Sequence, residues 1–78
     1  MGSDGTNKLV RMANQIADNF DYGKRDKAAA SVSDHLMRFW TPDMKRAIVE
    51  HRQSGKGGLN EIADEAVRSL AETIGQPA

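Results

Sequence analysis

Apolar side chains recur at helical spacing in four stretches of this chain, and no stretch alternates strictly between apolar and polar residues as a strand would. Each apolar stripe must be buried against another helix, which predicts an all-α fold. The chain has 78 residues, and separate cores usually need at least about 50 residues each. We therefore expect a small single-domain four-helix fold. So small a core often relies on a partner, and a dimer is one alternative.

Capping residues and helix breakers locate the ends of the first two helices. The first is expected to begin at Thr6 or Asn7, either of which can cap, and to end at Gly23. Asp26 is the predicted N-cap of the second helix. The folded domain is expected to cover residues 6–75, with a flexible N-terminus at 1–5 and a flexible C-terminus at 76–78.

The clearest boundary in the chain is Thr41-Pro42-Asp43. It combines a capping hydroxyl, a proline suited to the first helical position and a carboxylate near the positive end of the helix dipole. The third helix then runs to about Ser54, and Gly55-Lys56-Gly57-Gly58 breaks it. Asn60 is the predicted N-cap of the last helix, which Gly75 ends. These short connections predict near-antiparallel neighbours.

The apolar stripes of the four helices also predict the core. Large side chains at i, i+3, i+4 and i+7 should face inward on each helix. The residues expected in the core are Leu9, Ile16, Phe20, Val32, Leu36, Ile48, Val67 and Leu70.

Composition argues against several classes of function. Eleven basic residues balance 11 acidic ones, whereas nucleic-acid binders draw their affinity mostly from a basic face. No apolar run approaches the roughly 18 to 20 residues of a membrane span, so we expect a cytoplasmic protein that binds neither nucleic acid nor membrane. The chain has no cysteine, which excludes disulfides and thiolate metal ligands.

No candidate catalytic, cofactor-binding or metal-ligating residue emerges from the sequence. His35 and His51 are the only imidazoles, and neither sits in a ligand pattern that would surround one ion. No serine is visibly arranged with histidine and aspartate for nucleophilic catalysis. Ser54-Gly55-Lys56-Gly57-Gly58 lacks the spacing of a phosphate-binding loop and is interpreted as a connector between helices.

The segment Leu36-Met37-Arg38-Phe39-Trp40 has more large apolar side chains than one core-facing stripe can hold. Leu36 and Phe39 can face the core, while Met37 and Trp40 form a flanking stripe. Trp, Met and Arg are enriched at interface centres. We therefore predict a partner-binding surface with Trp40 as its anchor. Its residues are Met37, Arg38, Phe39, Trp40 and Met44. The alternative is that these side chains complete a small core.

Two further functions are compatible with this helical pattern. One is a free-standing homodimeric interaction module. The other is a helix-turn-helix DNA binder that uses Lys45, Arg46 and Arg52, although Asp43 and Glu50 place carboxylates on the same helix.

Two motifs are specific enough to compare with known families: Met12-Ala13-Asn14-Gln15-Ile16-Ala17, and Phe39-Trp40 followed by Pro42 and Met44. On these motifs the sequence resembles the delta subunit of the soluble, cytoplasmic NAD-dependent formate dehydrogenases that contain molybdenum or tungsten. Weaker matches extend the resemblance over most of the chain, at His35-Leu36, Gly57-Gly58-Leu59, Ala66-Val67 and Leu70. Asp43 stands where family members often carry a basic residue, so no charge contact is carried over there.

The resemblance implies a non-catalytic accessory subunit, or an assembly or stability factor, of a complex that oxidises formate to carbon dioxide and reduces NAD. It implies that molybdopterin, iron-sulfur clusters and FMN belong to the larger formate dehydrogenase subunits. Those larger subunits would be the partners of this chain, which would itself hold no cofactor.

Overall fold

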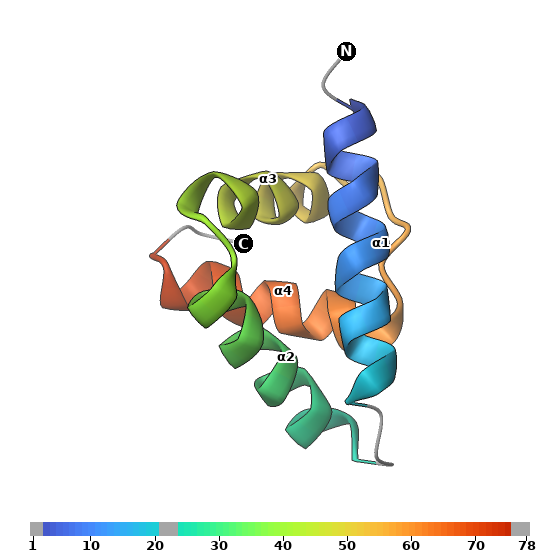
Figure 1. Cartoon of the computed structure of the whole chain (residues 1–78), viewed down its shortest axis with the longest axis vertical. Coiled ribbons are helices and arrows are strands. Elements are labelled where there is room, and N and C mark those ends of the chain that lie inside the picture. The colour runs from blue at the N-terminus through green and yellow to red at the C-terminus, as the bar shows by residue number, and fades with distance from the viewer. Residues whose placement is uncertain (1–2, 21–23, 76–78) are drawn as a thin grey trace.

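The computed structural model describes residues 3–20 and 24–75, and within these ranges the chain forms four α-helices and no strand (Figure 1). The helices are α1 (Ser3–Asn19), α2 (Arg25–Phe39), α3 (Pro42–Gln53) and α4 (Glu61–Thr73). The predicted all-α, four-helix class is confirmed. Residues 1–2 and 76–78 lie outside the described ranges, so the proposed flexible ends stay a prediction.

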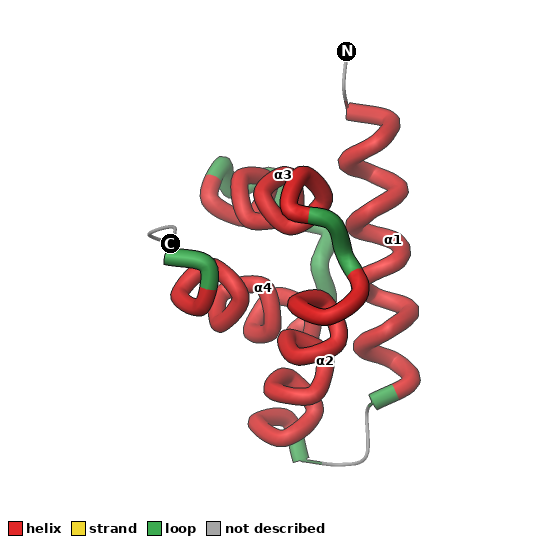
Figure 2. The backbone as a smooth tube through the Cα atoms, turned by 60° about the vertical axis from the view of Figure 1, so that its left-hand side comes forward, coloured by secondary structure: helices red, strands yellow, loops and turns green. Residues whose placement is uncertain are grey.

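The helices form two pairs that cross each other. Figures 1 and 2 show that α1 and α2 run in roughly opposite directions, as do α3 and α4, while the second pair lies across the long axis of α1. The predicted antiparallel arrangement therefore holds within each pair but not between the pairs. The most extensive contact joins α2 and α4, and α1 packs against all three other helices.

The predicted caps of the last two helices are confirmed. The Thr41 side chain accepts a hydrogen bond from the Met44 backbone N–H at 3.2 Å, and Pro42 occupies the first turn of α3. The Asn60 side chain accepts from the Ala63 backbone N–H at 2.8 Å at the start of α4. In each case a side-chain oxygen satisfies a backbone donor that lacks an intrahelical partner.

The first two helices begin elsewhere than predicted. α1 starts at Ser3, before the expected Thr6 or Asn7, and Gly23 lies outside the described residues. The N-cap of α2 is Lys24, which makes no side-chain capping bond, and the expected cap Asp26 lies within the first turn. An acidic side chain there still interacts favourably with the positive end of the helix dipole.

The core contains five of the eight predicted side chains, all fully buried. These are Val32, Leu36, Ile48, Val67 and Leu70. Leu9, Ile16 and Phe20 are only half-buried and pack against the edge of the core. On α1 the buried positions are instead Val10, Ala13 and Ala17. Small side chains let α1 approach its neighbours closely, which leaves its larger apolar residues along one flank.

Among the described residues, no helix combines the length and apolar character needed to cross a membrane.

Candidate partner-binding surface

The structure reverses the expected positions of two neighbouring aromatic residues. Trp40, expected to flank the core, is buried with 6% of its surface exposed, whereas Phe39, expected to face the core, is 70% exposed. The core-facing row of α2 is Ala28, Val32 and Leu36, spaced four residues apart, and Trp40 continues it. The proposed anchor of the partner-binding surface is therefore part of the core.

The backbone at the end of α2 shows how Trp40 enters the core. Trp40 is the C-cap of α2, with an extended backbone at φ −88° and ψ 144°, and its N–H still donates to the Leu36 carbonyl at 3.0 Å. Thr41 then caps α3 directly. The chain thus changes direction at Trp40, whose indole joins the cluster of buried side chains.

The other predicted surface residues do not gather around Phe39. Met37 and Met44 are half-buried against the core, and Arg38 is exposed and pairs with Asp34 at 3.0 Å. Two residues of an α-helix span about 200°, so Met37 and Phe39 lie on opposite sides of the core-facing row of α2. The five predicted residues therefore do not form one continuous surface.

A different set of side chains surrounds Phe39. The imidazole of His35, one helical turn earlier, lies 4.7 Å from the Phe39 ring between centroids, tilted by 42°. The ring of Phe20, directly after α1, meets His35 edge-on at 6.2 Å and 60°. We call Phe20, His35 and Phe39 the aromatic patch. It joins α2 to the end of α1. The sequence reasoning missed it because Phe39 was expected to face the core and because the Phe20–His35 contact joins residues distant along the chain.

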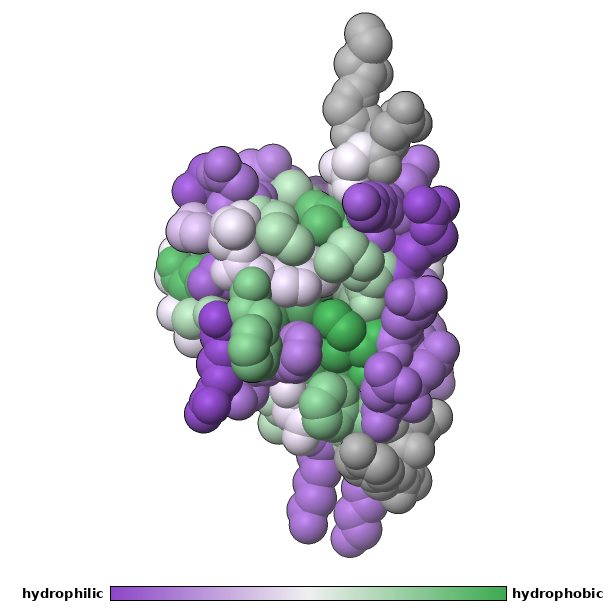
Figure 3. Space-filling view, viewed as in Figure 1, coloured by the Kyte–Doolittle hydropathy of each residue, from purple (hydrophilic) through white to green (hydrophobic). Residues whose placement is uncertain are grey.

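The aromatic patch continues the half-buried flank of α1. Leu9, Met12, Ile16 and Phe20 all pack partly against the core, and their spacing places them on one side of the helix. Figure 3 shows apolar side chains gathered over the region bounded by α1, α2 and α3, with polar side chains along the outer side of α1. This part of the surface is therefore both apolar and bordered by charge.

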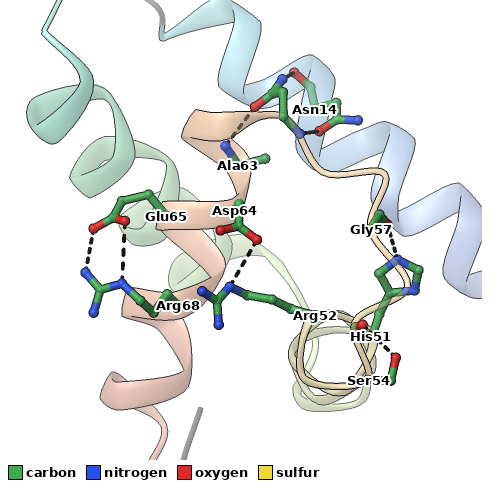
Figure 4. Close-up of polar contacts among 10 residues, drawn as sticks. Asn14, His51, Arg52, Ser54, Gly57, Ala63, Asp64, Glu65 and Arg68 are labelled. Atoms are coloured by element: carbon green, nitrogen blue, oxygen red, sulfur yellow. Dashed lines mark hydrogen bonds and ion pairs between the residues drawn. The ribbon is translucent and has the colours of Figure 1, made fainter.

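A second cluster that the sequence did not predict holds the glycine-rich connector against α1. The Asn14 side chain donates to the Gly58 carbonyl at 2.8 Å. It also accepts from the Asn60 backbone N–H at 2.8 Å (Figure 4). Gly58 has a φ of +97°, which favours glycine, and a Cβ there would lie 3.3 Å from a Val10 methyl group. The only sequence signal was the Met12–Ala17 motif, which did not reveal the contact.

His51 fastens the same connector from the side of α3. Its Nε2 lies 2.6 Å from the Gly57 carbonyl oxygen, and the Ser54 hydroxyl donates to the His51 carbonyl at 2.8 Å (Figure 4). Because side chains of α1 and α3 bond to this segment's carbonyls, the contacts agree with its interpretation as a structural connector.

The basic residues considered for DNA binding all make contacts within the molecule. Lys45 Nζ donates to the Met37 carbonyl at 3.2 Å, Arg46 pairs with Asp43 at 3.4 Å, and Arg52 pairs with Asp64 at 3.1 Å. These contacts orient the three side chains toward protein groups. They give the DNA-binding alternative no support.

An ion-paired cluster on α4 shifts the pKa values of two of its own members, Glu65 and Arg68. Arg68 bonds to Glu65 and pairs with Glu72 at 3.2 Å. The hydrogen bond from Arg68 lowers the pKa of the Glu65 carboxyl below its ordinary value, and the same bond raises the pKa of Arg68. Because both side chains are partly exposed, the pair is a surface feature of α4 that water screens.

Within the described residues, no group of three or more His, Asp or Glu side chains is placed to hold a metal ion. Comparison with curated proteins and with solved structures found no match. The sequence profile of the family described as NADH-dependent formate dehydrogenase delta subunit FdsD matches residues 8–67. That range contains α2 and α3, most of α1 and the first half of α4. On this match, which covers the motifs identified in the sequence, the chain belongs to the FdsD family of formate dehydrogenase delta subunits.

Proposed function

We propose that this chain is a non-catalytic accessory subunit of a cytoplasmic NADH-dependent formate dehydrogenase, acting in assembly or stability by binding the larger subunits. The observation that carries the proposal is Phe39, a large apolar side chain that is 70% exposed in a member of this subunit family. Exposed aromatic anchors are typical of residues that dominate binding energy in protein interfaces.

The side chains available for chemistry support an accessory role. The sequence has no cysteine to ligate an iron-sulfur cluster, and it lacks the glycine fingerprint of a dinucleotide site. Formate oxidation requires a cofactor to accept electrons. We therefore assign molybdopterin, the iron-sulfur clusters and FMN to the larger subunits, and the protein-binding role to this chain.

The aromatic patch is the proposed binding surface, with Phe39 as its anchor in place of Trp40. A partner pocket that covers the Phe39 ring would remove apolar surface from water, which favours association by roughly 25 cal/mol per Å² before the costs of ordering. Arg38 is exposed and pairs with Asp34 on the same helix, which suits a place at the polar rim. Met37 and Met44 contribute indirectly, because they pack against the core beneath α2 and α3.

The test is co-purification of the larger subunits with the tagged full-length chain, in wild-type form and as Phe39→Ala. We expect the substitution to weaken association by at least about 2 kcal/mol, the value typical of an interface hot spot. Because Phe39 is mostly exposed, helicity and melting temperature should be retained. A matched control is Lys27→Ala, an exposed residue on the same helix about three turns away.

Two results would contradict the proposal. If the Phe39→Ala variant associates as fully as wild type, the aromatic patch is not the binding surface. Self-association of the wild-type chain without any larger subunit, measured by light scattering after size exclusion, would favour the homodimeric module instead, because an exposed apolar patch can also bind a second copy.

A further inference from the structure

His35 lies between the two phenyl rings of the aromatic patch and is its only titratable side chain. Its ring contacts Phe39 at 4.7 Å and Phe20 at 6.2 Å between centroids, and it is half-buried. A partner that covers Phe39 must therefore also cover this imidazole. Building on the proposed function, we infer that docking requires neutral His35 and selects an uncharged, apolar pocket containing one hydrogen-bonding group.

The charges on α2 around His35 cancel each other. Asp34 precedes it and Arg38 lies one turn later, and these two exposed side chains pair at 3.0 Å. On the flank of α1 that carries Phe20, helical spacing places only uncharged residues. Among the described residues, the acidic residue nearest to Phe20 in sequence is Asp18. Its carboxylate accepts a hydrogen bond from the Asn60 side chain at 3.4 Å.

The charged groups of α4, which packs against the core side of α2, are also paired. Glu61 pairs with Arg25 at 3.0 Å and Asp64 with Arg52 at 3.1 Å. Glu65 and Glu72 share Arg68. With a neutral His35 the aromatic patch therefore has no net charge of its own, and its electrostatic complement is an uncharged pocket.

Protonation of His35 would place a cation at the centre of this surface. Covering that cation would remove its hydration, and the ring of Phe39 would recover only part of the loss, because cation–π attraction is weaker than the desolvation of a full charge. A neutral imidazole still presents a donor and an acceptor, which need a partner once water is excluded. Because His35 is half-buried, the one hydrogen-bonding group in the pocket serves the ring nitrogen that docking removes from water.

The inference predicts that acid weakens docking through His35. Affinity of the wild-type chain and of His35→Gln for the purified larger subunits would be measured at about pH 7.5 and about pH 5.5, the range over which histidine changes charge. Glutamine keeps a donor and an acceptor but does not titrate. At each pH, the dissociation constant of wild type is divided by that of His35→Gln. This ratio cancels any effect of titration of the larger subunits, because both proteins bind the same partner.

At the higher pH we expect His35→Gln to bind within about threefold of wild type, since hydrogen-bonding capacity is retained. At the lower pH, wild type should weaken by up to about tenfold relative to the variant, because only the chain with a neutral imidazole docks. Circular dichroism of both proteins at both pH values excludes unfolding as the cause.

The outcomes separate this inference from the proposed function. An unchanged ratio between the two pH values, or tighter binding of wild type in acid, would overturn the role of His35. If Phe39→Ala weakens docking while that ratio stays constant, the binding surface stands and only the histidine inference fails. A wild-type chain that binds no larger subunit at either pH would overturn both.

Discussion

The side-chain amide of Asn14 connects three parts of the molecule that are distant along the chain. It donates to Gly58 and accepts from Asn60, whose own side chain caps α4. One residue of α1 therefore fixes both the glycine-rich connector and the start of the last helix. This contact gives a physical reason for asparagine at the centre of the Met12–Ala17 motif.

Replacement of Asn14 by Ala should leave the Gly58 carbonyl and the Asn60 N–H without their partner. We expect the free energy of unfolding to fall by about 1–3 kcal/mol, the usual cost of unsatisfied groups in a partly buried site. Urea denaturation measures this value. The matched control is Gln15→Ala at the exposed next position of α1, which should change stability by less than about 0.5 kcal/mol. Equal effects of the two substitutions would contradict a specific role for Asn14.

Truncation of the neighbouring residues Phe39 and Trp40 should affect different properties. Phe39→Ala should weaken partner binding, whereas Trp40→Ala should lower stability. Because Trp40 is only 6% exposed, Trp40→Ala should lower the free energy of unfolding by about 3–5 kcal/mol, as large core truncations do. Thermal melting followed by circular dichroism measures the loss. A folded Trp40→Ala variant with wild-type stability and lost partner binding would restore Trp40 as the anchor and contradict its place in the core.

At the scale of helices, α4 has an apolar face toward α2 and an ion-paired outer face. Ala63, Ala66, Val67, Leu70 and Ala71 are buried, while Glu65, Arg68 and Glu72 form an ion-paired cluster that is at least partly exposed. Hydrogen bonding from Arg68 lowers the folded-state pKa of Glu65 below its ordinary value of 4.5. The folded chain therefore holds the Glu65 proton less tightly than the unfolded chain.

This shift predicts an acid-dependent contribution of Arg68 to stability. The contribution is fully present above the ordinary Glu65 value of 4.5 and is lost as the pH falls through the lowered folded value. The stability difference between wild type and Arg68→Gln should thus shrink between neutral pH and about pH 2. Urea denaturation of both proteins at the two pH values tests it, and a constant difference would contradict the assignment. The effect should be small because the pair is exposed.

At the scale of the whole molecule, the chain combines a small core with an apolar flank that the core does not cover. Fully buried side chains come from all four helices, but the large apolar residues of α1 are only half-buried. A domain this short can bury only about 60% of its unfolded surface. The uncovered flank and the aromatic patch therefore agree with a chain that completes its burial against another protein.

The isolated full-length chain should neither oxidise formate nor hold stoichiometric metal, flavin or NAD. The physical reason is the lack of cysteine ligands and of a dinucleotide fingerprint in the sequence. Elemental analysis, absorption spectroscopy and an NAD reduction assay check this expectation. One equivalent of bound metal or flavin would contradict the accessory role, whereas an adventitious surface ion at His35 or His51 would be removed by a chelator.

Local sequence information determined the helical elements and two of their caps. Thr41, Pro42 and Asn60 act on backbone groups within one helical turn, and such short-range bonds depend little on the rest of the fold. The residues listed as expected core members on α2, α3 and α4 are buried, because each of these helices has one dominant apolar stripe. They are Val32, Leu36, Ile48, Val67 and Leu70. The family motifs are likewise a property of the linear sequence.

Only the tertiary structure decided which aromatic side chain of α2 is exposed and how α1 packs. From Leu36, helical geometry places Phe39 about 60° to one side and Trp40 about 40° to the other, so both suit the local pattern. Burial in the shared core and the turn into α3 select Trp40. On α1, close approach selects Val10, Ala13 and Ala17 over larger neighbours. These choices depend on contacts between residues far apart in sequence, which periodicity along one helix does not specify.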